Sequence, residues 1–226
     1  MAKRQQGHLK PEELKGVTLR QSQQQYVKTI IENRVAFCYG PAGTSKTFSA
    51  VYAALKLYAD KKISKIILTK PIQEAGEKLG FLPGDVSEKI DPYMESFINN
   101  ATKIIDRQTL GFLISTEVIE MRPLAFMRGA TFDNSIMILD EAQNADFKQL
   151  MLFITRMGDT SKIVIAGDVS QYDISKNKVA LPDFINLIKD VKGVGTHTFT
   201  EKDIVRAKIL QDIVRKYEKW KDENNM

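Results

Sequence analysis

A short glycine-rich segment offers the clearest chemistry in this sequence. Residues 40–47 match the P-loop pattern G-x-x-x-x-G-K-[ST], except that Ser45 stands where the pattern has its second glycine. In such a loop, backbone N–H groups and the start of the next helix hold nucleotide phosphates. Lys46 would contact the β and γ phosphates, and the Thr47 hydroxyl would be a ligand of Mg²⁺. The residues predicted to bind the nucleotide here are Gly40, Pro41, Ala42, Gly43, Thr44, Ser45, Lys46 and Thr47. The alternative is an ordinary glycine-rich turn, because a relaxed form of the pattern arises by chance in about one in ten chains of this length.

Two adjacent acids supply the second element of the predicted site. Asp140 and Glu141 directly follow the apolar run 135–139. An acid at the end of such a strand is placed to hold the Mg²⁺ shell, which we assign to Asp140. The next acid can polarise the attacking water, which we assign to Glu141 as the catalytic base of an ATP hydrolase. Alternatively, the two acids could cap the helix expected after them.

A third polar cluster follows another apolar run, residues 163–166. Asp168 and Gln171 lie just beyond it. Ligands of open α/β sheets bind at the carboxyl ends of the strands, so the three loops are expected to meet in one crevice. Gln171 would contact the γ-phosphate or the attacking water, although a strand-ending turn with a solvated glutamine is the simpler alternative.

Alternating strands and helices are expected to position these loops. Apolar runs at 35–39, 65–69, 136–139 and 163–166 are typical of buried parallel strands, and 194–199 is a more alternating fifth strand. Helical patterns start at Ser22 and cover 47–59, 86–105, 145–157, 181–188 and 201–220. This order predicts an α/β fold, a P-loop NTPase with a parallel sheet covered by helices on both faces. We expect a single domain over residues 18–226, preceded by a basic tail over 1–17.

Several segments together resemble one known family. Residues 68–71 (LTKP), 74–85 (EAGEKLGFLPGD), 127–129 (MRG), 140–144 (DEAQN), 155–158 (TRMG) and 167–171 (GDVSQ) closely resemble the signature of the PhoH-like (phosphate-starvation-inducible) ATPases. The resemblance runs from about residue 19 to 217. That family is similar to the first RecA-like domain of superfamily 1 helicases. By this analogy, Gln23 reads the adenine edge, and Arg206 of the segment DIVR is a γ-phosphate sensor.

The chain departs from the family pattern at three positions. Ser45 replaces a glycine, Lys70 replaces the usual arginine of the Thr-Arg-Pro segment, and Ala207 stands where a histidine is common. Ser45 adds a hydroxymethyl group near the phosphates. A small polar residue is easier to accept there than a bulky one.

The glycine-containing segment 70–85 is the candidate nucleic-acid contact. In related helicases the corresponding segment lies along a single strand. The residues predicted to contact nucleic acid are Lys70, Lys78, Arg128 and Arg156 through phosphates, and Phe81 through base stacking. A subunit interface and a loop packed on its own core are the alternatives.

Composition narrows the class of protein. The 226 residues are 43% apolar, which excludes intrinsic disorder, and the lone Cys38 excludes a disulfide scaffold. No apolar run approaches the ~18 residues of a membrane span, so we expect a cytoplasmic protein, in the host cytoplasm if a phage encodes it. The formal charge of +5 is compatible with a polyanionic partner.

The leading hypothesis is an ATPase coupled to RNA or single-stranded DNA. A nucleotide-dependent switch or scaffold with slow hydrolysis is the main alternative. A small-molecule kinase is a third possibility, but the sequence shows no obvious arginine-rich lid. Because the length leaves room for one RecA-like lobe, we expect a homo-oligomer such as a ring. Arg156 or Arg206 would then act on the γ-phosphate, within one subunit or across two.

Overall fold

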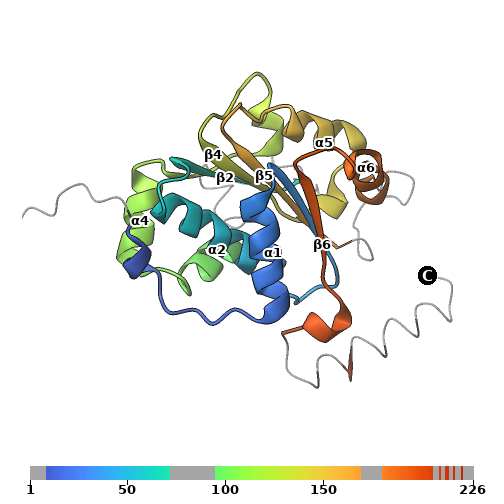
Figure 1. Cartoon of the computed structure of the whole chain (residues 1–226), viewed down its shortest axis with the longest axis horizontal. Coiled ribbons are helices and arrows are strands. Elements are labelled where there is room, and N and C mark those ends of the chain that lie inside the picture. Colours follow the sequence, from blue (N-terminus) through green and yellow to red (C-terminus); the bar gives the residue numbers. More distant parts are fainter. Residues whose placement is uncertain are drawn as a thin grey trace, which may run out of the picture.

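The fold is a six-stranded, all-parallel sheet with helices on both faces (Figure 1). The computed structural model describes residues 9–71, 95–168 and 180–205, together with Ile209, Asp212, Ile213, Lys216 and Trp220. The strands are β1 (Val35–Tyr39), β2 (Lys65–Thr69), β3 (Ile119–Met121), β4 (Ser135–Leu139), β5 (Lys162–Gly167) and β6 (Val194–Thr198), in the order β3-β2-β4-β5-β1-β6. The predicted fold class is confirmed.

The helices lie in two layers. The longer ones are α1 (Gln21–Glu32), α2 (Lys46–Ala59), α4 (Arg107–Ser115), α5 (Phe147–Ile154) and α6 (Leu181–Ile188). The short 3-10 turns are η1 (Pro11–Glu13), η3 (Leu124–Met127), η4 (Ala142–Asn144) and η6 (Glu201–Asp203). In Figure 1, α1, α2 and α4 cover one face of the sheet, and α5 and α6 cover the other. Among the described residues, no helix is long and apolar enough to cross a membrane.

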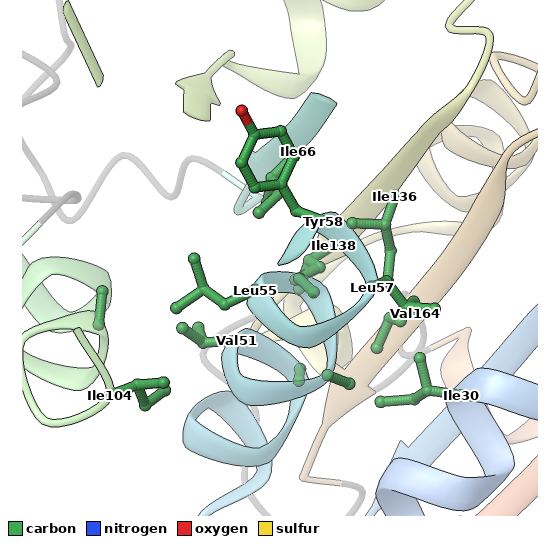
Figure 2. Packing of buried hydrophobic residues seen from close by; sticks show 14 of the residues in the cluster. Ile30, Val51, Leu55, Leu57, Tyr58, Ile66, Ile104, Ile136, Ile138 and Val164 are labelled. Carbon is green, nitrogen blue, oxygen red and sulfur yellow. The ribbon is translucent and has the colours of Figure 1, made fainter. Parts of the chain in front are cut away.

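Alternation along the strands divides the core in two. In β4, Ile136 and Ile138 pack with α1 and α2, whereas Met137 and Leu139 pack with η3, α5 and α6. Figure 2 shows the first cluster, in which Val51 and Leu55 of α2 lie on the side of the helix that faces Ile104. Because these central strands are buried on both faces, their sequences are continuous apolar runs, which is why they could be recognised.

The predicted boundaries hold best in the sheet. The strands at 35–39 and 65–69 and the helix at 181–188 are confirmed at both ends. The helix expected at 145–157 is shorter, because the Asp146 side chain accepts a hydrogen bond from the Gln149 N–H and starts the helix there. The edge strand β3 and the helix α4 were not predicted. The expected helix 86–105 lies partly outside the described residues, and residues 95–101 are helical.

The helix expected to begin at Glu201 does not begin there. Residues 201–203 form a single 3-10 turn, closed by the Asp203 carboxylate, which accepts hydrogen bonds from the Thr200 N–H and hydroxyl. Ile204 is extended, with φ −62° and ψ 122°. The Val205 N–H then donates to the Gly43 carbonyl at 2.8 Å, which ties this segment to the glycine-rich loop.

The described part of the predicted tail lies against the domain. Leu9 is 1% exposed and belongs to the core cluster shared with α1 and α2. The Lys15 N–H donates to the Ile104 carbonyl at 2.7 Å. Residues 1–8 lie outside the described residues.

Candidate functional site

The glycine-rich loop joins β1 to α2, and its backbone explains its residue types. A Cβ on Gly40 would lie 2.4 Å from the Phe199 carbonyl oxygen, and Gly43 has φ +81°. Ser45 also has left-handed backbone angles, φ 66° and ψ 32°, at the position where the P-loop pattern has glycine. The loop therefore adopts, at a non-glycine residue, the left-handed backbone that favours glycine.

Lys46 is held over its own loop. Its ammonium donates hydrogen bonds to the carbonyls of Gly40 at 2.6 Å and Pro41 at 2.9 Å. Lys46 is also the first residue of α2, whose N-terminus carries a partial positive charge. Loop and helix thus direct positive charge to one point, as an anionic phosphate requires.

The predicted metal ligands are in contact. The Thr47 hydroxyl donates to the Asp140 carboxylate, 2.9 Å from Oδ2 and 3.1 Å from Oδ1. Burial raises the pKa of Asp140 above its usual value, and the nearby Lys70 ammonium opposes this rise. Among the described residues, no group of three or more His, Cys, Asp or Glu side chains could hold a metal alone. A hydroxyl and a carboxylate fit Mg²⁺, which usually takes few protein oxygens and completes its shell with phosphates and water.

A glutamine connects the loops that follow β4 and β5. Gln143 Nε2 donates to Glu141 Oε2 at 2.7 Å, and Gln143 Oε1 accepts from the Asp168 N–H at 2.9 Å. Gly167 leaves room for this amide, since a Cβ there would lie 2.9 Å from Gln143 Oε1. Glu141 is exposed and left-handed, with φ 54°. Sequence reasoning missed Gln143, although it lies within the DEAQN segment.

The predicted adenine reader lies at the start of α1. Gln23 is buried, and its Oε1 accepts a hydrogen bond from the Arg20 N–H at 2.8 Å. Val205 lies beside the loop through its bond to Gly43. Gln23 and Val205 both line the same cavity as Lys46.

A cavity of about 690 Å³ brings these groups together. Its lining comprises Val17, Thr18, Arg20, Gln23, Ala42, Gly43, Thr44, Ser45, Lys46, Thr47, Phe48, Ser96, Asn100, Lys103, Asp140, Glu141, Gln143, Asp168 and Val205. Ser96, Asn100 and Lys103 were missed by sequence reasoning. Ser96 and Asn100 lie four residues apart on one side of the helical segment 95–101, and Lys103 lies in the turn that follows. The i, i+4, i+7 spacing of the three was the available signal.

Other predicted residues lie elsewhere. The Arg156 guanidinium donates to the carbonyls of Ala130 at 3.1 Å and Leu152 at 3.3 Å, beside the loop that leads into β4. Arg156 therefore lies at the opposite end of the strand from Asp140. Arg128 is exposed after η3 and does not line the cavity. Gln171, Lys78, Phe81 and Arg206 lie outside the described residues.

Comparison with known proteins identifies the family of this chain. A family model described as PhoH-like protein matches residues 16–218. The chain belongs to the PhoH-like family. A PhoH-like protein of Mycobacterium bovis is 39% identical over 202 residues, which are 89% of this chain and 57% of that protein. A PhoH-like protein of Synechocystis is 41% identical over 198 residues (87% and 60%), and protein PhoH of Escherichia coli is 32% identical over 200 residues (87% and 56%). The chain spans less than two thirds of the length of these relatives.

Solved structures share the fold at low sequence identity. The large terminase of a thermophilic bacteriophage has a TM-score of 0.54 at 11% identity, covering 88% of this chain and 50% of that one. The structure of that terminase in complex with ADP gives a TM-score of 0.53. The PhoH-like chain thus has a P-loop NTPase fold of the RecA-like type.

Proposed function

We propose that this PhoH-like chain binds ATP with Mg²⁺ in the cavity and hydrolyses it. The observation that carries the proposal is the set of hydrogen bonds that joins residues of the three loops. Thr47 at the start of α2 contacts Asp140 after β4, and Gln143 joins Glu141 to Asp168 after β5. An ordinary glycine-rich turn accounts for none of these contacts.

Each residue has a distinct task in this proposal. The loop N–H groups and Lys46 bind the phosphates, and Gln23 orients the base. When bound, Mg²⁺ neutralises charge on the phosphate oxygens, and Thr47 and Asp140 would hold it. Glu141 takes a hydrogen bond from the attacking water, while Gln143 fixes the carboxylate in position.

We also propose that turnover is coupled to single-stranded RNA or DNA and that subunits assemble into a ring. The resemblance to a helicase lobe, the formal charge of +5 and the exposed Arg128 support the first point. The second rests on the charge that develops on the γ-phosphoryl oxygens during transfer, which an arginine from a neighbouring subunit would stabilise.

A nucleotide-dependent switch is the second candidate. The observation that favours it is the hydrogen bond from Gln143 Nε2 to Glu141 Oε2, which already uses one of the two carboxylate oxygens as an acceptor. The switch predicts tight binding with very slow turnover that nucleic acid does not change.

The deciding experiment measures ATP turnover with and without single-stranded RNA and single-stranded DNA. Glu141→Gln should lower kcat by about 10²–10⁴-fold, the usual contribution of a general base. Glu117→Gln is the matched control, because Glu117 is also an exposed left-handed glutamate, with φ 56°, but does not line the cavity. Wild-type turnover without stimulation by either strand would contradict the nucleic-acid coupling, and equal turnover in Glu141→Gln would contradict the assigned base.

A further inference from the structure

The Asp140 carboxylate already has a cationic partner, and that partner is not the P-loop lysine. Lys70 Nζ lies 3.7 Å from Asp140 Oδ2, and the side chains are 19% and 9% exposed. Lys46, in contrast, donates to the carbonyls of its own loop. Within the described residues, the ammonium that pairs with the predicted metal ligand therefore comes from the end of β2.

Strand register fixes this pair. Parallel pairing of β2 with β4 sets Thr69 opposite Leu139, so Lys70 and Asp140 are the first residues beyond two paired strands. The Asp140 N–H also donates to the Thr69 carbonyl at 3.0 Å, which locks the two backbones together. The register thus places the two residues side by side, and the largely buried Lys70 side chain completes the contact.

The same carboxylate oxygen cannot serve two cations equally well. Oδ2 accepts the Thr47 hydroxyl at 2.9 Å and faces Lys70 at 3.7 Å. Lys70 and Asp140 also line one small pocket with Thr47, so the ammonium stands within the space around both predicted ligands. A Mg²⁺ ion held by Thr47 and Asp140 would lie close to the Lys70 ammonium, and two cations close together in a buried site repel strongly.

We propose that Lys70 is the counter-ion of Asp140 in the metal-free site and competes with Mg²⁺ for that carboxylate. Entry of the metal with its nucleotide then requires the Lys70 ammonium to leave Asp140. Lysine suits this exchange because it makes a single point-charge contact, whereas arginine forms two parallel hydrogen bonds to a carboxylate. The inference rests on the proposed nucleotide site and names a residue that tunes its metal dependence.

The test measures equilibrium binding of a fluorescent ADP analogue to the full chain, in excess Mg²⁺ and in EDTA, at pH 8. The readout is the Mg²⁺ coupling ratio, Kd in EDTA divided by Kd in Mg²⁺. Lys70→Met removes the competing charge and should raise this ratio by about tenfold, which corresponds to ~1.4 kcal/mol. Lys70→Arg keeps the charge and should leave the ratio at or below the wild-type value.

Lys65→Met is the matched control. Lys65 lies at the other end of β2 and forms a partly buried ion pair with Glu120 at 2.6 Å, away from the cavity. Its substitution should leave the ratio unchanged. Lys70→Gln repeats the test if Lys70→Met does not fold, as judged by circular dichroism.

The outcomes separate this inference from the proposed function. An unchanged ratio in Lys70→Met overturns it, and so does an equal weakening of both Kd values, since that would mean that Lys70 contacts phosphate directly. Wild-type protein that binds no nucleotide, or binds it without Mg²⁺ dependence, would instead overturn the proposed site itself.

Discussion

Ser45 carries a side chain where the backbone favours glycine. Its φ of 66° lies in the left-handed region, and its side chain makes no capping hydrogen bond to α2. Replacing it by glycine removes the Cβ without losing a helix cap. Ser45→Gly should therefore stabilise the protein and should not weaken nucleotide binding.

The magnitude follows from two opposing terms. A left-handed residue with a Cβ costs ~1–2 kcal/mol relative to the right-handed region. Glycine lowers stability by ~0.4–1 kcal/mol, because it gives the unfolded chain more conformational freedom. The net gain is about 0.5–1 kcal/mol, and at ~2–4 °C per kcal/mol for a domain of this size Tm should rise by about 1–4 °C.

Calorimetry and ADP titration on the same samples test this reasoning. Ser45→Ala keeps the Cβ and should show no rise in Tm. Lys61→Gly is the matched control at the other end of α2, because Lys61 is exposed and left-handed with φ 56°. It should raise Tm similarly and leave nucleotide affinity unchanged. A lower Tm in Ser45→Gly, or weaker ADP binding, would refute the argument and would show that the serine hydroxyl contributes directly.

Three further substitutions test other parts of the structure. Gln143→Leu leaves Glu141 without its amide partner and should lower kcat by about 10–100-fold, the effect of a hydrogen bond to a charged group, with nucleotide affinity unchanged in titration. Lys162→Met removes the ammonium that binds carbonyls at the end of α1 and should cost about 1–3 kcal/mol in urea unfolding, whereas Lys28→Met, on the exposed face of α1, should cost under about 0.5 kcal/mol. Arg206→Ala and Glu141→Gln proteins, each inactive alone, should recover ATPase activity when co-assembled. Mixtures that stay inactive would place the arginine in its own subunit or outside the reaction.

Much of the sheet could be predicted from the sequence because the central strands are buried on both sides. All five residues of β4 are buried, the four from 136 to 139 are apolar, and the run ends sharply at Asp140. The edge strand β3 could not be recognised this way, because it has three residues and only Ile119 is buried. Burial on one face leaves no continuous apolar run to detect.

The loops of the site could be located, but not the contacts between them. The local P-loop pattern predicted Lys46 and Thr47, and the acid at the end of an apolar run predicted Asp140. The pairing of Lys70 with Asp140 depends on the register of β2 against β4, across seventy residues of sequence. Arg156 shows the opposite case, since its place at a helix end suggested the site while its guanidinium binds carbonyls at the far end of β4.

The central claim is that the cavity binds ATP through Lys46 and hydrolyses it through Glu141. The most direct test is equilibrium ATP binding by Lys46→Ala and Glu141→Gln, measured beside the wild type in Mg²⁺. Lys46→Ala should weaken binding by at least about tenfold, the loss expected for a charge-assisted hydrogen bond. Glu141→Gln should bind ATP as tightly as the wild type, because only the carboxylate that faces water has changed. Wild-type affinity in Lys46→Ala, or lost binding in Glu141→Gln, would contradict the account.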